Sequence, residues 1–332
     1  MKYKPYPWQQ SQWQHVRQAQ ILGKLPHALL LHGIAGLAKQ HFSDCLIHSL
    51  LCVDVNADGL ACGQCRGCHL LATGAHPDLY RVNLQEKAKN IKVDQIRAVK
   101  EFLTLSSHCG GYRIVIIAPA EIMNHAAANA LLKVLEEPGK GALLLLVCHH
   151  PALLPATVLS RCQSLVFSPC ETNVAKLWLQ QTQADLVHID LAIALSQGAP
   201  LKALAWLDDE TLAQRQKVFA ALILFQQSRI DPMTLASNFL ELDFSVVLDH
   251  LISWLLDAIK ISSGLNQTEV INIDQVQAIA EFSQKVRPQA HFLLLEKLIE
   301  VKRMVLQGSQ LNKQLLLEDL LTTWLVVCSH TA

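Results

Sequence analysis

Residues 29–40 constrain the fold most, because a short apolar run leads there into a glycine loop and then into the start of a helix. The apolar run at 29–31 predicts a buried strand. Gly33, Gly36 and Lys39 follow it in the manner of a phosphate loop, in which glycines admit phosphates to backbone N–H groups and a lysine reaches their oxygens. An ordinary strand, turn and helix is the alternative interpretation.

Two positions depart from the phosphate-loop pattern GxxxxGK[ST]. Ala38 replaces the second glycine, and its Cβ is unfavourable because the loop needs a positive φ there. Gln40 replaces the small hydroxyl residue that holds Mg²⁺ in an intact loop. The sequence therefore predicts weak or absent nucleotide binding, with neither ATP nor Mg²⁺ as a cofactor.

The length and charge of the chain limit its class. Its 332 residues exceed what one hydrophobic core usually serves, so we expect two or three domains. The 28 basic and 28 acidic residues cancel, which leaves no overall field to attract a nucleic acid or a membrane. Ten cysteines, no hydrophobic leader and no apolar stretch long enough for a bilayer predict a cytoplasmic protein with reduced thiols.

The apolar periodicity changes along the chain. Up to residue 166, short apolar runs at 28–31, 113–117 and 143–147 alternate with helical patterns, which is typical of an α/β domain with a parallel sheet. Three short helical patterns then predict a small helical lid at 167–207. Residues 208–332 are predicted to be all-α, with helical runs at 218–225, 244–261, 276–286, 291–306 and 311–328. Such helices bury one another, and a domain of this kind can also serve in oligomerisation.

Four cysteines are closely spaced after the first helix: Cys52, Cys62, Cys65 and Cys68. This spacing in a reducing compartment predicts a tetrahedral Zn²⁺ site, which is structural because four thiolates leave no open position for water. Three glycines supply the tight turns of this stretch: Gly59, Gly63 and Gly67. Unligated thiols are the alternative, and His69 is a possible but unneeded replacement ligand.

The apolar run at 113–117 predicts a buried strand of the kind that delivers carboxylates to Mg²⁺ and water in phosphate-loop ATPases. Ala118 and Pro119 follow it instead, and Glu121 lies beyond the expected strand end. Asn124 is expected to cap a helix over 125–137. Arg161 follows the next strand and an exposed turn, where an arginine is ordinarily a solvated surface residue.

Several motifs occur together in the order of the clamp-loader branch of the AAA+ ATPases, which the chain resembles over most of its length. They are HALL at 27–30, the four-cysteine knuckle, IKVDQIR at 91–97, NALLKVLEEP at 129–138 and LSRC at 159–162. The resemblance implies an AAA+ (P-loop-type) parallel-sheet domain with a zinc module at about 52–68, a helical lid and a helical collar domain for oligomerisation.

The resemblance also implies a role. It favours a non-hydrolysing stator subunit over a tau/gamma-like subunit with intact ATPase machinery. Arg161, in the Ser-Arg-Cys motif, is implied to be an arginine finger that reaches the nucleotide of an adjacent subunit. The position of the sensor-2 arginine of the family is held by Leu201, with Lys202 beside it, which is a further departure from an ATP-binding subunit.

The implied partners are tau/gamma ATPase subunits and a delta subunit in a hetero-oligomeric ring, with the sliding clamp and primed DNA contacted through that complex. The chain is expected to have no enzymatic activity of its own, although the complex belongs to a DNA-directed DNA polymerase III holoenzyme.

Two other classes stay open. An active tau/gamma-like ATPase needs an intact GKT and carboxylates after the strand, which are missing here. A zinc-dependent nucleic-acid-binding module needs several cations, whereas residues 52–68 contain only Arg66. Lys92 and Arg97 either face DNA or form an ordinary solvated helix face.

Overall fold

The computed structural model describes residues 3–85, 88–109, 111–182, 188–264, 270–306 and 312–329. The chain divides into two compact units, one formed by Met1–Trp178 with Ala199–Leu201 and the other by Leu179–Gly198 with Lys202–Ala332. The finer division at residues 166 and 207 stays a prediction. No helix in the described ranges is both long and apolar enough to cross a membrane.

A parallel five-stranded sheet forms the centre of the first unit, in the order β2-β3-β4-β1-β5. The strands are β1 (Ala28–His32), β2 (Leu79–Asn83), β3 (Arg113–Ala118), β4 (Ala142–Cys148) and β5 (Gln163–Val166). Leu30 of β1 pairs with Leu146 of β4 and Ser164 of β5. The three central strands are apolar except for Arg113 at the start of β3 and His32 at the end of β1, because both faces of a parallel sheet are buried.

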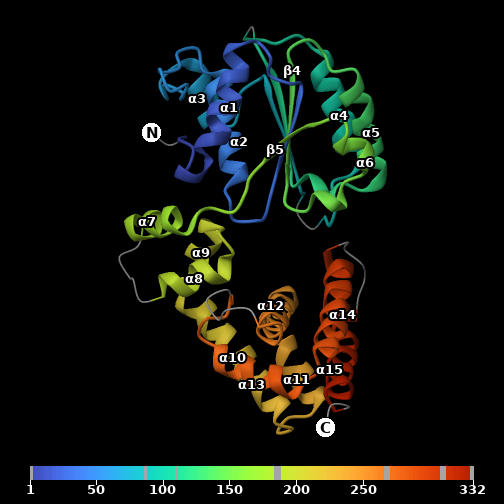
Figure 1. Ribbon diagram of the computed structural model, residues 1–332. Coiled ribbons are helices and arrows are strands. Elements are labelled where there is room, and N and C mark those ends of the chain that lie inside the picture. Colours follow the sequence, from blue (N-terminus) through green and yellow to red (C-terminus); the bar gives the residue numbers. More distant parts are fainter. Residues whose placement is uncertain are drawn as a thin grey trace. The chain divides into compact units, whose positions relative to one another are not determined.

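Helices cover both faces of this sheet (Figure 1). One face carries α1 (Gln10–Ile21), α2 (Lys39–Leu51) and α3 (Arg66–Ala72), and the other carries α4 (Val93–Thr104), α5 (His125–Glu136) and α6 (Ala156–Leu159). Side chains alternate between the two layers, so Leu29 and Leu31 join one core while Leu30 joins the other. Helix α7 (Thr172–Thr182) follows the sheet.

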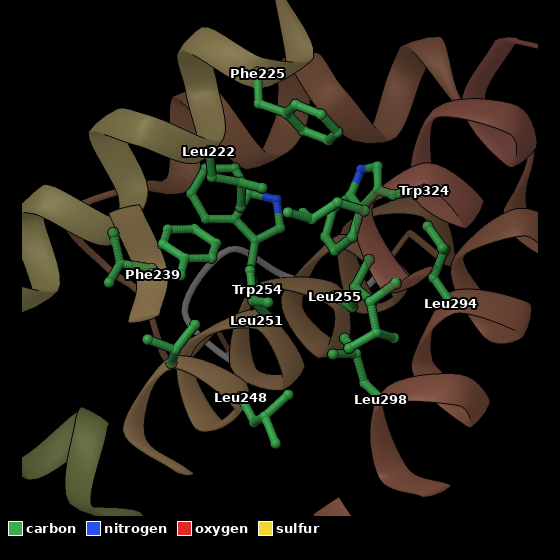
Figure 2. Close-up of a cluster of buried hydrophobic side chains, with 14 of the residues drawn as sticks. Leu222, Phe225, Phe239, Leu248, Leu251, Trp254, Leu255, Leu294, Leu298 and Trp324 are labelled. Carbon is green, nitrogen blue, oxygen red and sulfur yellow. The ribbon is translucent and has the colours of Figure 1, made fainter. Parts of the chain in front are cut away.

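The second unit is helical throughout its described residues. After α8 (Ile189–Ser196) and α9 (Pro200–Trp206), it contains α10 (Asp209–Gln226), α11 (Pro232–Leu240), α12 (Phe244–Ser262), α13 (Val276–Lys285), α14 (Pro288–Leu306) and α15 (Lys313–Ser329). Figure 2 shows Leu251, Trp254 and Leu255 of α12 among apolar side chains of the surrounding helices. These buried faces explain the helical apolar period of the sequence.

Aspartates start three of these helices. The carboxylate of Asp208 accepts the backbone N–H of Thr211, and Asp231 and Asp243 cap α11 and α12 in the same way. The predicted α/β fold with a helical C-terminal domain is confirmed, but α11 and the strands β2 and β5 were not among the predicted elements. Leu311, the predicted start of the last helix, lies outside the described residues.

Candidate functional site

The glycine loop joins β1 to α2 with three left-handed or glycine-type backbone conformations. Gly33 has a φ of 147° and Gly36 a φ of 87°, while Ala38, which precedes α2, has a φ of 59°. A Cβ on Gly33 would lie 2.2 Å from the carbonyl oxygen of Phe167. The positive φ expected at position 38 is therefore present, and a residue with a Cβ occupies it.

Lys39 points back onto its own loop. Its Nζ donates to the carbonyl oxygens of Gly33 at 2.6 Å and Ile34 at 2.8 Å, and the residue is 2% exposed. Burial lowers the pKa of Lys39 to about 8, although the charge of Glu121 acts in the opposite direction. The amine that would grip a phosphate is thus already engaged by backbone acceptors.

Other parts of the first unit hold further carbonyls of the loop. The Trp8 indole donates to Leu37 O at 3.1 Å, and the Gln9 amide donates to Leu37 O at 2.8 Å and to Ala38 O at 2.9 Å. The backbone N–H of Leu201 donates to Gly36 O at 3.1 Å. The loop is therefore fixed by the chain itself. The position that the resemblance assigns to a sensor arginine makes a backbone contact here.

Glu121 lies in a short 3-10 helix, Ala120–Ile122, after β3. Its Oε1 accepts the backbone N–H of His149 at 2.8 Å, and its Oε2 is buried without a hydrogen-bond partner among the described residues. Ala118 and Pro119 stand at the strand end, as the sequence indicates. Sequence reasoning set Glu121 aside, whereas the structure brings its charge to bear on Lys39.

The four cysteine sulfurs converge, as the sequence predicts. All four Sγ atoms lie within 4.8 Å of one another. The Cys52 sulfur lies 3.6 Å from that of Cys62 and 3.8 Å from that of Cys65, and the Cys62 and Cys68 sulfurs are 4.0 Å apart. Tetrahedral Zn²⁺ with Zn–S bonds of about 2.3 Å places its sulfurs about 3.8 Å apart. The cluster therefore fits a closed, structural zinc site.

Backbone N–H groups support this cluster. The Cys52 sulfur accepts from Cys62 N at 3.3 Å, the Cys62 sulfur accepts from Cys65 N at 3.3 Å, and the Cys65 sulfur accepts from Cys68 N at 3.4 Å. Burial raises the pKa of the Cys68 thiol to about 12, whereas hydrogen bonds outweigh burial at Cys65 and lower its pKa to about 6. A divalent cation removes this inequality because a coordinated thiol is deprotonated outright.

The glycines of the module have two different uses. Gly59 and Gly63 have positive φ values of 75° and 78°, so they make the predicted turns. Gly67 lies in α3, where a Cβ would approach the carbonyl oxygen of Leu51 to 2.4 Å. Its role is therefore close packing, which corrects the prediction of a turn there. His69 is exposed and is not part of the sulfur cluster.

Contacts to α1 and α2 anchor the module. The Trp13 indole donates to Asp58 O at 3.1 Å, and the Ser49 hydroxyl donates to Gly59 O at 2.6 Å. The guanidinium of Arg17 lies against Gly59, where a Cβ would come within 1.8 Å of its Nε. The module is thus fastened to the sheet domain by neutral hydrogen bonds and close packing.

Arg161 lies on the turn after α6, with its side chain 37% exposed. Its Nε donates to Oε1 of Glu136 at 3.0 Å, and its Nη2 lies 2.7 Å from the same oxygen. Nη1 donates to Thr157 O at 3.1 Å. The exposed turn is as the sequence indicates, the finger role stays a prediction, and Glu136 is a partner that sequence reasoning missed.

Comparison with known proteins decides the family. A model described as DNA polymerase III, delta subunit, matches residues 8–171, and one described as its C-terminal part matches residues 209–325. DNA polymerase III subunit delta′ of Pseudomonas aeruginosa is 33% identical over 325 residues, which cover 96% of this chain and 97% of that protein. The chain belongs to the delta′ family of DNA polymerase III subunits.

A second delta′ protein agrees with this placement. Subunit delta′ of Escherichia coli (strain K12) is 31% identical over 318 residues, covering 95% of this chain and 94% of that protein. Apart from the family placement, a solved gamma-subunit-related protein of Thermotoga maritima is a distant structural likeness, with a TM-score of 0.40 at 17% identity, covering 94% of this chain and 98% of that one.

Two further cations of this delta′ family chain were singled out from the sequence. Arg97 pairs with Asp94 at 2.9 Å on the exposed side of α4, and Lys92 precedes that helix. Both side chains therefore belong to a solvated helix face, and a contact with DNA stays untested. Lys202 is exposed and belongs to the second unit.

Proposed function

We propose that this chain is the stator of a clamp loader: it does not hydrolyse ATP, it joins tau/gamma ATPase subunits and a delta subunit in a ring, and it lends Arg161 to its neighbour. The assembled ring would load the sliding clamp on primed DNA. One observation carries the proposal. The amine of the nucleotide loop is turned inward onto Gly33 and Ile34, while the guanidinium of Arg161 lies exposed on a turn of the same unit.

The groups needed for hydrolysis in cis are missing or occupied. Lys39 is bound by its own loop, Gln40 cannot replace the Mg²⁺-binding hydroxyl, and β3 ends without a carboxylate at Ala118 and Pro119. An arginine that serves this chain's own site would therefore have little to act on. A guanidinium acting across an interface can raise a phosphoryl-transfer rate by roughly 10³ to 10⁵ because it neutralises developing charge.

The second unit offers a surface for assembly. Phe292, Ile299 and Leu306 recur every seven residues along α14 and are 55%, 51% and 39% exposed. A seven-residue apolar repeat places these side chains on one helix face, which is the pattern that packs against another helix. This face supports the proposed role of the helical domain in joining the ring. The zinc site is proposed to be structural and to have no part in the chemistry.

The main test is Arg161→Ala in the reconstituted loader. We expect normal complex formation by gel filtration and a fall of about 10³-fold in clamp-dependent ATP turnover, because an exposed arginine supports little of the core. Arg161→Lys should restore only part of the rate, since an ammonium lacks the planar fork. Arg81→Ala is the matched control: Arg81 is 36% exposed and pairs with Asp44 at 2.7 Å. Unchanged turnover in an intact Arg161→Ala complex would remove the finger role.

The rival, an active ATPase, is tested on the purified chain alone. We expect neither ATP hydrolysis nor tight Mg-ATP binding, because two of the three N–H donors of Lys39 are taken by backbone carbonyls and Gln40 offers no hydroxyl to Mg²⁺. Titration calorimetry measures this directly. Micromolar binding of Mg-ATP would contradict the proposed stator and favour a tau/gamma-like subunit.

A further inference from the structure

We infer that Glu136 is a positioning residue for Arg161: it holds the Nε and Nη2 edge of the guanidinium and thereby fixes the direction of the remaining Nη2 hydrogen. This inference rests on the proposed function, since it describes how the proposed finger is kept in place. Nε and Nη2 of Arg161 both meet a single carboxylate oxygen, Oε1 of Glu136, at 3.0 and 2.7 Å. Nη1 is held separately, by the carbonyl of Thr157 at 3.1 Å and the hydroxyl oxygen of Ser160 at 3.4 Å.

The two residues are 25 positions apart and come together because their helices are fixed by the core. Glu136 ends α5, whose Leu135 is 2% exposed, and Arg161 follows α6, whose Val158 is fully buried. Backbone bonds continue the turn of α6 through Arg161, whose N–H donates to Val158 O at 3.2 Å. The spacing of carboxylate and guanidinium is therefore set by packed backbone, which suits a fixed brace.

The geometry leaves one N–H of the guanidinium, on Nη2, available. An arginine has five N–H groups, and the pair of Nη atoms forms the fork that grips phosphate oxygens. Glu136 takes the Nε–H and one hydrogen of Nη2, both on the side of the side chain that faces α5. Among the described residues, no acceptor takes the second Nη2 hydrogen. The fork is thus oriented while part of its donor capacity stays free.

Prior orientation matters because a long, exposed side chain loses rotamer freedom when it binds. A brace that fixes the guanidinium beforehand removes part of that loss at the moment of reaction. An exposed ion pair adds little to folding, so the contact is better explained by orientation than by stability. The opposite role is that Glu136 holds Arg161 away from the phosphate and competes with it. Removing the Glu136 carboxylate would then raise kcat, whereas removing a positioning residue lowers it.

The experiment compares Glu136→Ala, Glu136→Gln and Glu137→Ala in the reconstituted loader, with kcat and KM for ATP measured separately. Glu137 is the adjacent exposed carboxylate and has no side-chain pair among the described contacts, so it is the matched control. We expect Glu136→Ala to lower kcat roughly three- to tenfold without changing KM, since ATP binding by the neighbour does not use this contact. Glu136→Gln should retain most of kcat because its amide oxygen still accepts from Nε and Nη2.

Two further measurements separate this inference from the proposed function. In the double variant Glu136→Ala/Arg161→Ala, turnover should equal that of Arg161→Ala alone, because Glu136 acts only through the arginine. In the isolated chain, the NMR signal of the Arg161 Nε–H should shift in Glu136→Ala and stay in place in Glu137→Ala.

An unchanged or raised kcat in Glu136→Ala, with Arg161→Ala still defective, would overturn the brace and leave the finger standing. Loss of kcat in Glu137→Ala equal to that in Glu136→Ala would also overturn it. If Arg161→Ala itself is fully active, the proposed function fails and the brace fails with it, whatever the NMR signal does.

Discussion

The glycine loop and the cysteine module lie in the same unit and follow one another in the chain, yet they treat their ligand groups in opposite ways. In the glycine loop, Lys39 turns inward and donates to two carbonyls of that loop. In the cysteine module, four sulfurs converge, and those of Cys52, Cys62 and Cys65 accept backbone N–H groups. The glycine loop itself supplies acceptors for its lysine. Four thiolates, by contrast, would need a cation such as Zn²⁺ to balance their charge.

The difference teaches that a motif indicates a site only when its side chains face a common space. Gly33 and Lys39 keep the outline of a phosphate loop, but the lysine has acceptors already. The cysteines come from turns and from the start of α3, but their sulfur separations match a tetrahedral ion. Both sites need the right residue types and spacing. Whether the side chains point toward a ligand or toward their own backbone distinguishes the two.

The largest test of this contrast is Cys65→Ala in the module. We expect loss of about one Zn²⁺ per chain and local unfolding of residues 52–68, since structural zinc can contribute on the order of 10 kcal/mol to its own small module. Metal analysis and hydrogen exchange check this, and the helical second unit should keep its protection. Cys109→Ala, at an exposed cysteine outside the cluster, is the control. Metal-free protein from a chelator-free purification would contradict the zinc assignment.

A smaller effect is expected from Lys39→Met in the loop. The pKa of Lys39 is about 8 in the folded chain and near 10.5 when unfolded, so the unfolded state binds more protons between these values. The free energy of unfolding of the wild type should therefore rise with pH across this window, by about 3 kcal/mol more than that of Lys39→Met. Denaturant unfolding at several pH values measures it, with the exposed Lys140→Met as control. Parallel pH profiles for wild type and Lys39→Met would show that Lys39 keeps an ordinary pKa.

The smallest effect concerns residues with a positive φ, which occur in both the glycine loop and the cysteine module. Gly63 has a φ of 78° and open space around its missing Cβ, so Gly63→Ala should cost about 1 kcal/mol from backbone strain alone. Gly111 also has open space but needs no positive φ, and Gly111→Ala should leave stability nearly unchanged. Denaturation midpoints of the zinc-saturated proteins give the comparison. An equal loss of stability in Gly63→Ala and Gly111→Ala would mean that a Cβ at position 63 causes no backbone strain.

Much of the fold could be predicted from the sequence because the signals were local. Apolar runs marked β1, β3 and β4, and helical spacing marked most of the second unit. Strand β5 was missed because it has four residues and begins with the exposed polar pair Gln163 and Ser164. Helix α11 was missed because it is short, although Asp231 before Pro232 is a usable start signal.

The candidate sites were predictable in composition but not in direction. Cysteine spacing was sufficient to bring four sulfurs together, because short turns leave few alternatives. The inward turn of Lys39 and the influence of Glu121 depend on how separate strands end at one edge of the sheet. Glu136 and Arg161 are 25 residues apart in the sequence, so their contact cannot be predicted from a local sequence pattern.

The fastening of the cysteine module to α1 and α2 has a consequence for the whole first unit. Binding of Zn²⁺ would be coupled to folding of the module. The hydrogen bonds from Trp13 to Asp58 and from Ser49 to Gly59 extend this coupling to α1 and α2. By mass action, each tenfold rise in free Zn²⁺ above the dissociation constant adds about 1.4 kcal/mol to the folded state. If the module binds Zn²⁺, we expect the melting temperature of this unit to rise with the concentration of free Zn²⁺.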